Sequence, residues 1–278
     1  MKKKKTRNQR NWLKLFKFLI ITSILLFAIS SVKLIVDSNE NDKIIKSIDH
    51  FKDLMELYFG NNIQEIKVFG SYDRDTNLPR NIDSKSDVDI MVVFNDDGSK
   101  PQTFLDRIRR AVEHYYTSSD IKQSSPTIVL DMKHIKFEIT PAIVKNELYY
   151  IKRYDEWCVT YCFSDKSNLV EANKNNYYKI KPVIRLIKYW NICKNSKNIS
   201  SYLIETKIVE KFKYYTNGCY NLIEYLIVSF KYLRMYVEQK TYQDKIDTAI
   251  EYLESAKKYE KDDYLYSIIV LNKVIEDL

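Results

Sequence analysis

Glycine, proline, cysteine and histidine are scarce in this chain. Only 4 glycines and 5 prolines occur among 278 residues, which excludes collagen-like repeats and flexible linkers rich in glycine and proline. There are 4 cysteines and 3 histidines. No two cysteines form a CxxC pair, and no histidine stands near a cysteine at the spacing of a zinc site. We therefore predict no zinc site and four reduced, structural thiols, at Cys158, Cys162, Cys193 and Cys219.

Acidic residues are missing from the first 36 positions. Nine of the 45 basic residues lie in that stretch, which leaves 36 basic against 37 acidic residues in the rest of the chain. The excess of positive charge is therefore confined to an N-terminal tail. Because binding of a nucleic-acid duplex needs a basic face on the folded body, we predict no such face here.

A long apolar run follows the basic tail. Positions 18–36 read FLIITSILLFAISSVKLIV, and their only charge is Lys33. As a helix, these 19 residues would extend roughly 28 Å, enough to cross the hydrocarbon core of a bilayer. A buried core helix and a cleavable signal peptide are the alternatives, but no convincing small-x-small cleavage site follows. The run predicts a membrane anchor.

The remaining chain divides into an α/β half and a helical half. Apolar spacing predicts helices at 42–58 and 101–116, and strands at 66–69 and 88–94. Two more strands are expected in the segments TIVLDM and IKFEITPAIV. Longer helical patterns then occupy 176–194, 201–215, 221–239 and 244–259. We expect three parts, 1–37 as tail and anchor, 38–165 as the α/β core and 166–278 as the helical domain.

Two aspartates, Asp87 and Asp89, lie one residue apart at the start of the apolar strand expected at 88–94. Because side chains alternate along a strand, both point to one face, while Val88 and Ile90 point into the core. A charge in such a position is costly unless something pairs with it. Two carboxylates one strand-pitch apart are oxygen ligands suited to Mg²⁺.

Three further residues complete a candidate site. Gly70 and Ser71 end the preceding strand and offer backbone N–H groups and a hydroxyl without a Cβ in the way of a phosphate. Glu138 lies on the polar face of IKFEIT, where it would supply a third carboxylate if the two strands are neighbours. The alternative is a solvated glutamate paired with Lys133 or Lys136.

The order of strand, Gly-Ser, loop, DVDIMVVF, helix and acid-bearing strand resembles the nucleotidyltransferases of the polymerase-β superfamily. In the second half, IKPVIRLIKYWN followed by SYLIET is similar to the branch of the cyclic-GMP–AMP synthases and oligoadenylate synthases, including the bacterial CD-NTase or SMODS-type enzymes. This resemblance implies an α/β nucleotidyltransferase core with a small mixed β-sheet, followed by a packed helical half, with the hydrophobic N-terminal helix outside it.

The resemblance also implies roles for particular residues. Asp87, Asp89 and Glu138 would be catalytic and would hold Mg²⁺ or Mn²⁺. Contacts to the triphosphate and the base of the nucleotide would come from Gly70, Ser71, Lys188, Ser201 and Tyr202. Alternatives from the residues themselves are a solvated Lys188, a helix N-cap at Ser201 and a core position for Trp190.

This chain departs from the family pattern at two positions. It has Asp75 where the family has glycine before Thr76, which puts an acid near the expected path of a phosphate. Its third carboxylate, Glu138, is more often an aspartate.

The implied activity is transfer of nucleotidyl groups from NTPs, with a cyclic or linear oligonucleotide signal as product and an effector that senses this product, as in anti-phage defence. The alternatives are transfer to a small molecule or protein, and a catalytically silent, membrane-tethered nucleotide sensor. Flanking charge favours an N-terminus inside the cell. Because NTPs are cytosolic, we nevertheless expect the catalytic part to face the cytoplasm.

Overall fold

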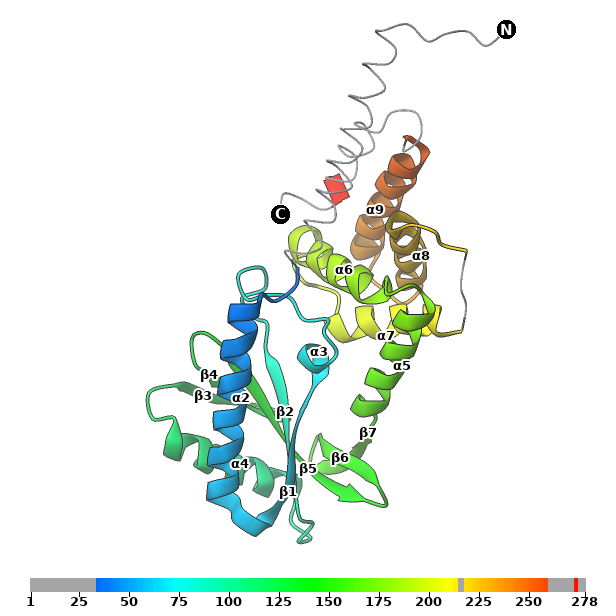
Figure 1. Cartoon of the computed structure of the whole chain (residues 1–278). Coiled ribbons are helices and arrows are strands. Elements are labelled where there is room, and N and C mark those ends of the chain that lie inside the picture. The colour runs from blue at the N-terminus through cyan, green and yellow to red at the C-terminus, as the bar shows by residue number, and fades with distance from the viewer. Residues whose placement is uncertain (1–33, 215–217, 260–272, 275–278) are drawn as a thin grey trace, which may run out of the picture. The chain divides into compact units, whose positions relative to one another are not determined.

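A computed structural model of the chain describes residues 34–214, 218–259 and 273–274. Two compact units emerge, Val36–Glu171 and Ala172–Leu278 (Figure 1). The first contains α2 (Ser38–Phe59), the short η1 (Gly60–Asn62), β1 (Ile63–Phe69), α3 (Gly70–Asp73), β2 (Val88–Phe94), α4 (Pro101–Tyr115), β3 (Asp120–Ser124), β4 (Thr127–Asp131), β5 (Lys136–Lys145), β6 (Leu148–Arg153) and β7 (Glu156–Thr160). Helix α5 (Cys162–Asn175) leads into the second unit, which holds α6 (Ile180–Asn195), α7 (Ser201–Lys213), α8 (Leu222–Arg234) and α9 (Lys240–Tyr259).

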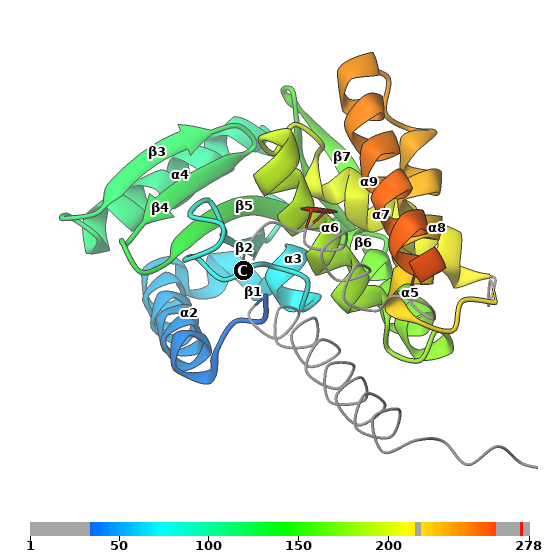
Figure 2. The ribbon, with the colours of Figure 1, turned by 90° about the horizontal axis from the view of Figure 1, so that it is seen from above.

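The strands of the first unit form one mixed sheet in the order β1-β2-β5-β4-β3 (Figure 2). Strands β2 and β5 are parallel, whereas β1 with β2 and β4 with β5 are antiparallel. The long β5 pairs with β4 near its beginning and with β6 near its end. The resulting mixed sheet, followed by helices, confirms the expected architecture.

Helices α2 and α4 cover one face of the sheet, because both are amphipathic. Asp37 caps α2 by accepting a hydrogen bond of 2.9 Å from the backbone N–H of Glu40, and Pro101 starts α4. Their apolar faces meet alternate residues of the strands in a single core. Its fully buried members include Phe51 and Met55 of α2, Phe104 and Ile108 of α4, and Ile90, Val92, Phe94, Phe137 and Ile139 of β2 and β5.

The opposite face of the sheet carries apolar side chains next to Asp89. Met91, Val93 and Ala142 form a smaller apolar cluster there. Asp89 precedes Met91 by two residues in β2, so strand alternation places its carboxylate on this face.

The second unit consists of helices packed through apolar side chains. Asn221 caps α8 by accepting a hydrogen bond of 3.0 Å from the N–H of Glu224. Trp190 of α6 packs edge-on against Phe230 of α8, with ring centroids 4.9 Å apart. Trp190 is therefore a core residue, as predicted.

Most of the predicted membrane anchor, 18–36, lies outside the described residues. Its last three residues are described, and they form a turn and bend, so the predicted helix does not extend to Val36. Within 34–214, 218–259 and 273–274, no helix combines the length and apolar character that crossing a bilayer requires.

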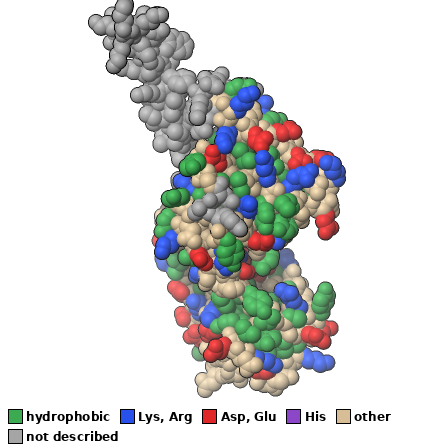
Figure 3. Space-filling view, turned by 90° about the vertical axis from the view of Figure 1, so that its right-hand side faces the viewer, with side chains coloured by type: hydrophobic (Ala, Val, Ile, Leu, Met, Phe, Trp, Pro, Cys, Tyr) green, Lys and Arg blue, Asp and Glu red, His purple; other side chains and the backbone are tan. Residues whose placement is uncertain are grey.

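Charges are mixed over the visible surface. On the face in Figure 3, Lys and Arg side chains are interspersed with Asp and Glu side chains.

The four cysteines all lie in the described part of the chain and form no disulfide with one another.

Candidate active site

Two of the three predicted carboxylates lie on neighbouring strands. In the parallel pair of β2 and β5, Asp89 stands directly opposite Glu138. Asp87 immediately precedes β2, with one residue between it and Asp89. The adjacency on which the predicted cluster depended is therefore confirmed, and the three carboxylates gather where β2 and β5 begin.

Gly70 is packed directly against Asp89. Phe69, the last residue of β1, pairs with Asp89 across the antiparallel ladder, so Gly70 follows at the same level of the sheet. Gly70 has φ +72°, and a Cβ at this position would lie 1.7 Å from Oδ2 of Asp89. Both the backbone conformation and the close approach of the carboxylate require glycine. The buried Gly70 thus brings the Gly-Ser turn against the carboxylates.

The negative charges of Asp87, Asp89 and Glu138 repel one another. Burial, together with the charges of Asp87 and Glu138, raises the pKa of Asp89 to about 7. Burial and the charge of Glu138 also raise the pKa of Asp87. Like charges held together in a poorly solvated place gain most from a cation. The donor set, made of carboxylate oxygens, is the one that a hard divalent ion such as Mg²⁺ prefers, so these residues fit that ion.

Lys136 provides a positive charge in the cluster. Its Nζ lies 3.1 Å from Oδ2 of Asp87 and 2.9 Å from Oε1 of Glu138. Burial alone would lower the pKa of Lys136, but its hydrogen bond to Glu138 and the charge of Asp87 outweigh burial, and the pKa is raised. The alternative that Glu138 pairs with a lysine is thus correct for Lys136. In this arrangement, no three His, Cys, Asp or Glu side chains of the described part of the chain stand ready to hold a metal ion.

Arg74 is a residue of this site that we did not predict. It is buried, its backbone N–H donates to the carbonyl of Gly70 at 3.2 Å, and its charge counteracts the rise in the pKa of Asp89. The signal was available in the sequence, because the family pattern G-S-x-x-R-G-T, which begins here at Gly70, has an arginine at this position. A second cation beside the carboxylates also offers a contact for phosphate oxygens.

Backbone hydrogen bonds within the turn after Gly70 hold it closed. The backbone N–H of Thr76 donates to the carbonyl of Ser71 at 2.9 Å, and that of Asp75 donates to Tyr72 at 3.0 Å. Asp75 sits between these bonds with φ +55°. This left-handed conformation favours glycine, and aspartate tolerates it better than most residues do. The backbone conformation at position 75 therefore explains why this chain can have an aspartate where the family has a glycine.

We expect Asp75→Gly to change the free energy of unfolding by less than about 1 kcal/mol, because glycine adopts this backbone without steric cost. Asp75→Val should destabilise the fold by about 1–3 kcal/mol, since a β-branched residue is strained at positive φ. Denaturant unfolding of both variants checks this. A loss above that range for Asp75→Gly would show that the aspartate side chain, and not its backbone, holds the turn.

The three other predicted residues belong to the helical unit. Lys188 on α6 is only 6% exposed at its side chain, and its Nζ lies 3.1 Å from Oε2 of Glu205 on α7, so the alternative of a solvated lysine is wrong. Ser201 is the first residue of α7, and the N-cap is Ser200, so the alternative of a cap at Ser201 is wrong by one residue. Tyr202 is 60% exposed. Asp87, Asp89, Glu138, Gly70 and Ser71 all belong to the α/β unit.

Comparison with known proteins identifies the family. The model of the Second Messenger Oligonucleotide or Dinucleotide Synthetase domain, SMODS, matches residues 27–173. A probable cyclic nucleotide synthase of Bacillus cereus (strain VD146) is 28% identical over 254 residues, which cover 74% of this chain and 73% of the relative. A cyclic AMP-AMP-AMP synthase of an Acinetobacter species is 27% identical over 172 residues, or 57% of this chain and 49% of the relative.

Solved structures share the fold. CdnC of Escherichia coli MS115-1, solved with ATP, superposes with a TM-score of 0.70 at 14% identity and covers 92% of this chain and 97% of its own. The CD-NTase CdnG of Bradyrhizobium diazoefficiens, solved with GTP, gives 0.68 at 12% identity, with 88% and 96% covered. The mixed sheet, the following helices and the SMODS match over half of the sequence agree. The chain belongs to the SMODS family and is a nucleotidyltransferase of the CD-NTase type, similar to cyclic-GMP–AMP synthase.

Proposed function

We propose that the chain makes a cyclic or linear oligonucleotide second messenger from NTPs, with Mg²⁺ or Mn²⁺ bound by Asp87, Asp89 and Glu138. The observation that carries the proposal is the pairing of Asp89 with Glu138 beside Gly70. Support also comes from the relatives, whose names describe cyclic nucleotide synthases. When bound, such an ion supplies activation of the attacking hydroxyl and stabilisation of the leaving pyrophosphate.

The chain's own residues would position the nucleotide. Gly70, which has no side chain, lets the Gly-Ser turn lie against the Asp89 carboxylate. The Ser71 hydroxyl can then donate to a phosphate beside the carboxylates. Arg74 adds a positive charge near Asp89. We assign the carboxylates the role of a negative charge in a fixed position. The Gly70 backbone packs against Asp89, so the Asp89 side chain cannot move in that direction.

Lys188, Ser201 and Tyr202 would bind the triphosphate and the base. Glu205 holds the Lys188 ammonium in one place, so a phosphate would meet an oriented donor. The Ser201 hydroxyl and N–H lie in the first turn of α7, where backbone donors lack intrahelical partners. The exposed ring of Tyr202 offers a flat surface on which a base can stack.

We further propose that the product acts on an effector in defence against phage, and that the apolar run at 18–36 anchors the chain in a membrane with its catalytic part facing the cytoplasm. The defence role rests on the family resemblance. CdnC has been solved in complex with a HORMA protein, and a protein partner of that kind is a further proposal for this chain.

Incubation of the purified protein with all four NTPs and Mg²⁺ or Mn²⁺, followed by mass spectrometry, tests the activity. We expect oligonucleotide products with 3′,5′ or 2′,5′ linkages, together with pyrophosphate. Nucleotidylated protein or small molecule would support transfer to another acceptor. No turnover of any NTP, with nucleotide binding intact, would favour the silent sensor.

A further inference from the structure

One lysine side chain lies within the carboxylate cluster. The ammonium of Lys136 is 3.1 Å from Oδ2 of Asp87 and 2.9 Å from Oε1 of Glu138. Asp87 immediately precedes β2, whereas Lys136 and Glu138 belong to β5, so the lysine joins the two strands where both begin. Its side chain is only 18% exposed. Water therefore screens these contacts less than it screens an ion pair at the surface.

The cluster needs positive charge to stay assembled. Burial and the charge of Glu138 raise the pKa of Asp87, and burial together with the charges of Asp87 and Glu138 raises that of Asp89. The charge of Arg74 counteracts the rise at Asp89, and the charge and hydrogen bond of Lys136 counteract it at Asp87. Without Lys136, Asp87 and Glu138 would lose the ammonium that both of them contact.

A divalent ion would compete with Lys136 for the same oxygens. Mg²⁺ binds carboxylate oxygens at about 2.0–2.1 Å, so an ion held by Asp87 and Glu138 would lie close to the ammonium. A carboxylate can accept more than one partner. The ion and the ammonium nevertheless repel each other at such short range, and this repulsion is strong where water screens it poorly. An ion that binds both carboxylates therefore displaces the ammonium.

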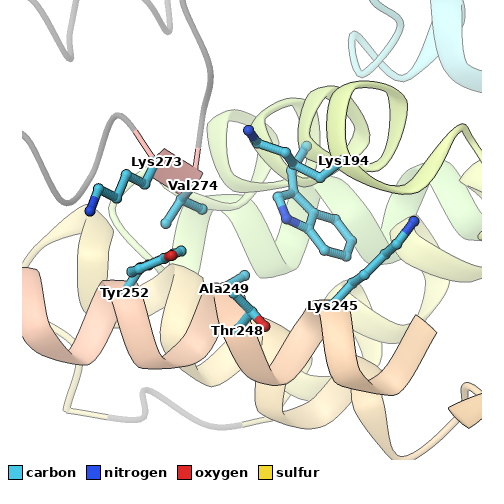
Figure 4. Close-up of a pocket in the computed structure, with 8 residues that line it drawn as sticks. Lys194, Lys245, Thr248, Ala249, Tyr252, Lys273 and Val274 are labelled. Carbon is cyan, nitrogen blue, oxygen red and sulfur yellow. The ribbon is translucent and has the colours of Figure 1, made fainter. Parts of the chain in front are cut away.

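The helical unit has lysines around a pocket of about 380 Å³, between α6, α9 and positions 273–274 (Figure 4). They are Lys194, Lys245 and Lys273. Trp190 in the pocket wall is only 2% exposed, because it packs on Phe230, so the pocket borders the core of the helical unit. Neither Asp87, Asp89 nor Glu138 lines it. A lysine and the proposed metal ligands thus meet at Lys136 and not at this pocket.

We propose that Lys136 is a positioning residue that keeps Asp87 and Glu138 in place before a divalent ion binds, and that gives up their oxygens to the ion. The inference rests on the proposed metal role of these carboxylates. Lys136 then has two opposite effects, because it stabilises the metal-free fold and weakens the binding of the metal.

Titration of the full-length protein with Mn²⁺ in the absence of nucleotide tests the inference, with free Mn²⁺ measured by electron paramagnetic resonance. Lys136→Met should bind Mn²⁺ at least about tenfold more tightly than the unsubstituted protein, because the ion no longer has to displace an ammonium. In EDTA, the same variant should have a lower free energy of unfolding, since the carboxylates have lost their counter-ion. An ion pair with a structural role alone would lower stability without tightening the binding of Mn²⁺.

Three further variants control this experiment. Lys136→Gln, whose amide can still donate to Glu138, should also bind Mn²⁺ more tightly, and it guards against misfolding of Lys136→Met. Lys136→Arg keeps the charge and should bind Mn²⁺ about as the unsubstituted protein does. Lys145→Met is the matched control, because Lys145 ends the same strand and pairs with Asp96 at 2.9 Å, seven residues beyond Glu138. It should leave the binding of Mn²⁺ unchanged.

Equal or weaker binding of Mn²⁺ in both Lys136→Met and Lys136→Gln overturns the inference, and so does an equal gain in Lys145→Met. Absence of detectable Mn²⁺ binding to all of these proteins overturns it as well. The mass-spectrometric assay with NTPs separates these results from failure of the proposed function. Oligonucleotide products from the unsubstituted protein would show that synthesis occurs although Lys136 has no such role, whereas absence of products would show that the proposed function fails too.

Discussion

Asp89→Asn should reduce nucleotide incorporation by more than about 100-fold, because the metal contribution of several kcal/mol to the transition state depends on its ligands. The same substitution should raise the free energy of unfolding measured in EDTA. Asp89 is half-buried beside Asp87 and Glu138, whose charges repel it, and an amide of the same shape removes that repulsion. Pyrophosphate release and denaturant unfolding measure the two effects.

Asp120→Asn is the matched control for Asp89→Asn. Asp120 lies on β3, the far edge strand of the same sheet, and pairs with Lys122 at the surface. Its replacement should change neither turnover nor stability by much, since exposed ion pairs contribute at most about 1 kcal/mol. Turnover close to normal in Asp89→Asn would exclude the carboxylate cluster as the catalytic centre. Lower stability would contradict the repulsion that we infer.

Gly70→Ala should both destabilise the fold and abolish most of the activity. A Cβ at this position would fall 1.7 Å from the Asp89 carboxylate, so either the turn or Asp89 has to move. Positive φ alone costs an alanine about 1–3 kcal/mol, and the steric conflict adds to this cost. A displaced Asp89 no longer faces Glu138, and turnover should fall as far as it does in Asp89→Asn.

Gly98→Ala separates the two contributions. Gly98 has φ +78°, close to the φ of Gly70, but a Cβ there meets no atom within 4 Å. This variant should therefore show the backbone strain alone, with normal turnover. The difference in unfolding free energy between the two variants measures the conflict with Asp89. If Gly70→Ala is no less stable and no less active than Gly98→Ala, the close packing of Gly70 on Asp89 has no consequence.

The elements with strong periodic patterns were predictable. The strand at 88–94 and the helix at 101–116 occur as β2 and α4, because each has enough apolar residues at one period. Strands β3, β6 and β7 were missed. They are short and mostly exposed or half-buried, so their sequences show no alternation, and they form through pairing with neighbours.

The site was predictable only in part. Alternation along the strands showed which face Asp89 and Glu138 occupy, but their parallel register is a tertiary property. The bridge from Lys136 to two carboxylates and the buried pair of Lys188 with Glu205 also depend on elements meeting in space. The sequence around a lysine does not show whether its ammonium group meets a buried carboxylate or solvent.

The parallel pairing of β2 with β5 determines when the candidate active site can form during synthesis of the chain. A hairpin cannot join parallel strands, and here α4, β3 and β4 lie between them in the chain. Such non-local pairing forms slowly, because the chain loses the conformational entropy of the intervening segment before the contacts between the two strands can stabilise it. During translation, β1 and β2 can pair as soon as they leave the ribosome, carrying Asp89 without Glu138. The three carboxylates assemble when β5 enters between β2 and β4, so a nascent chain stays inert until that strand is in place.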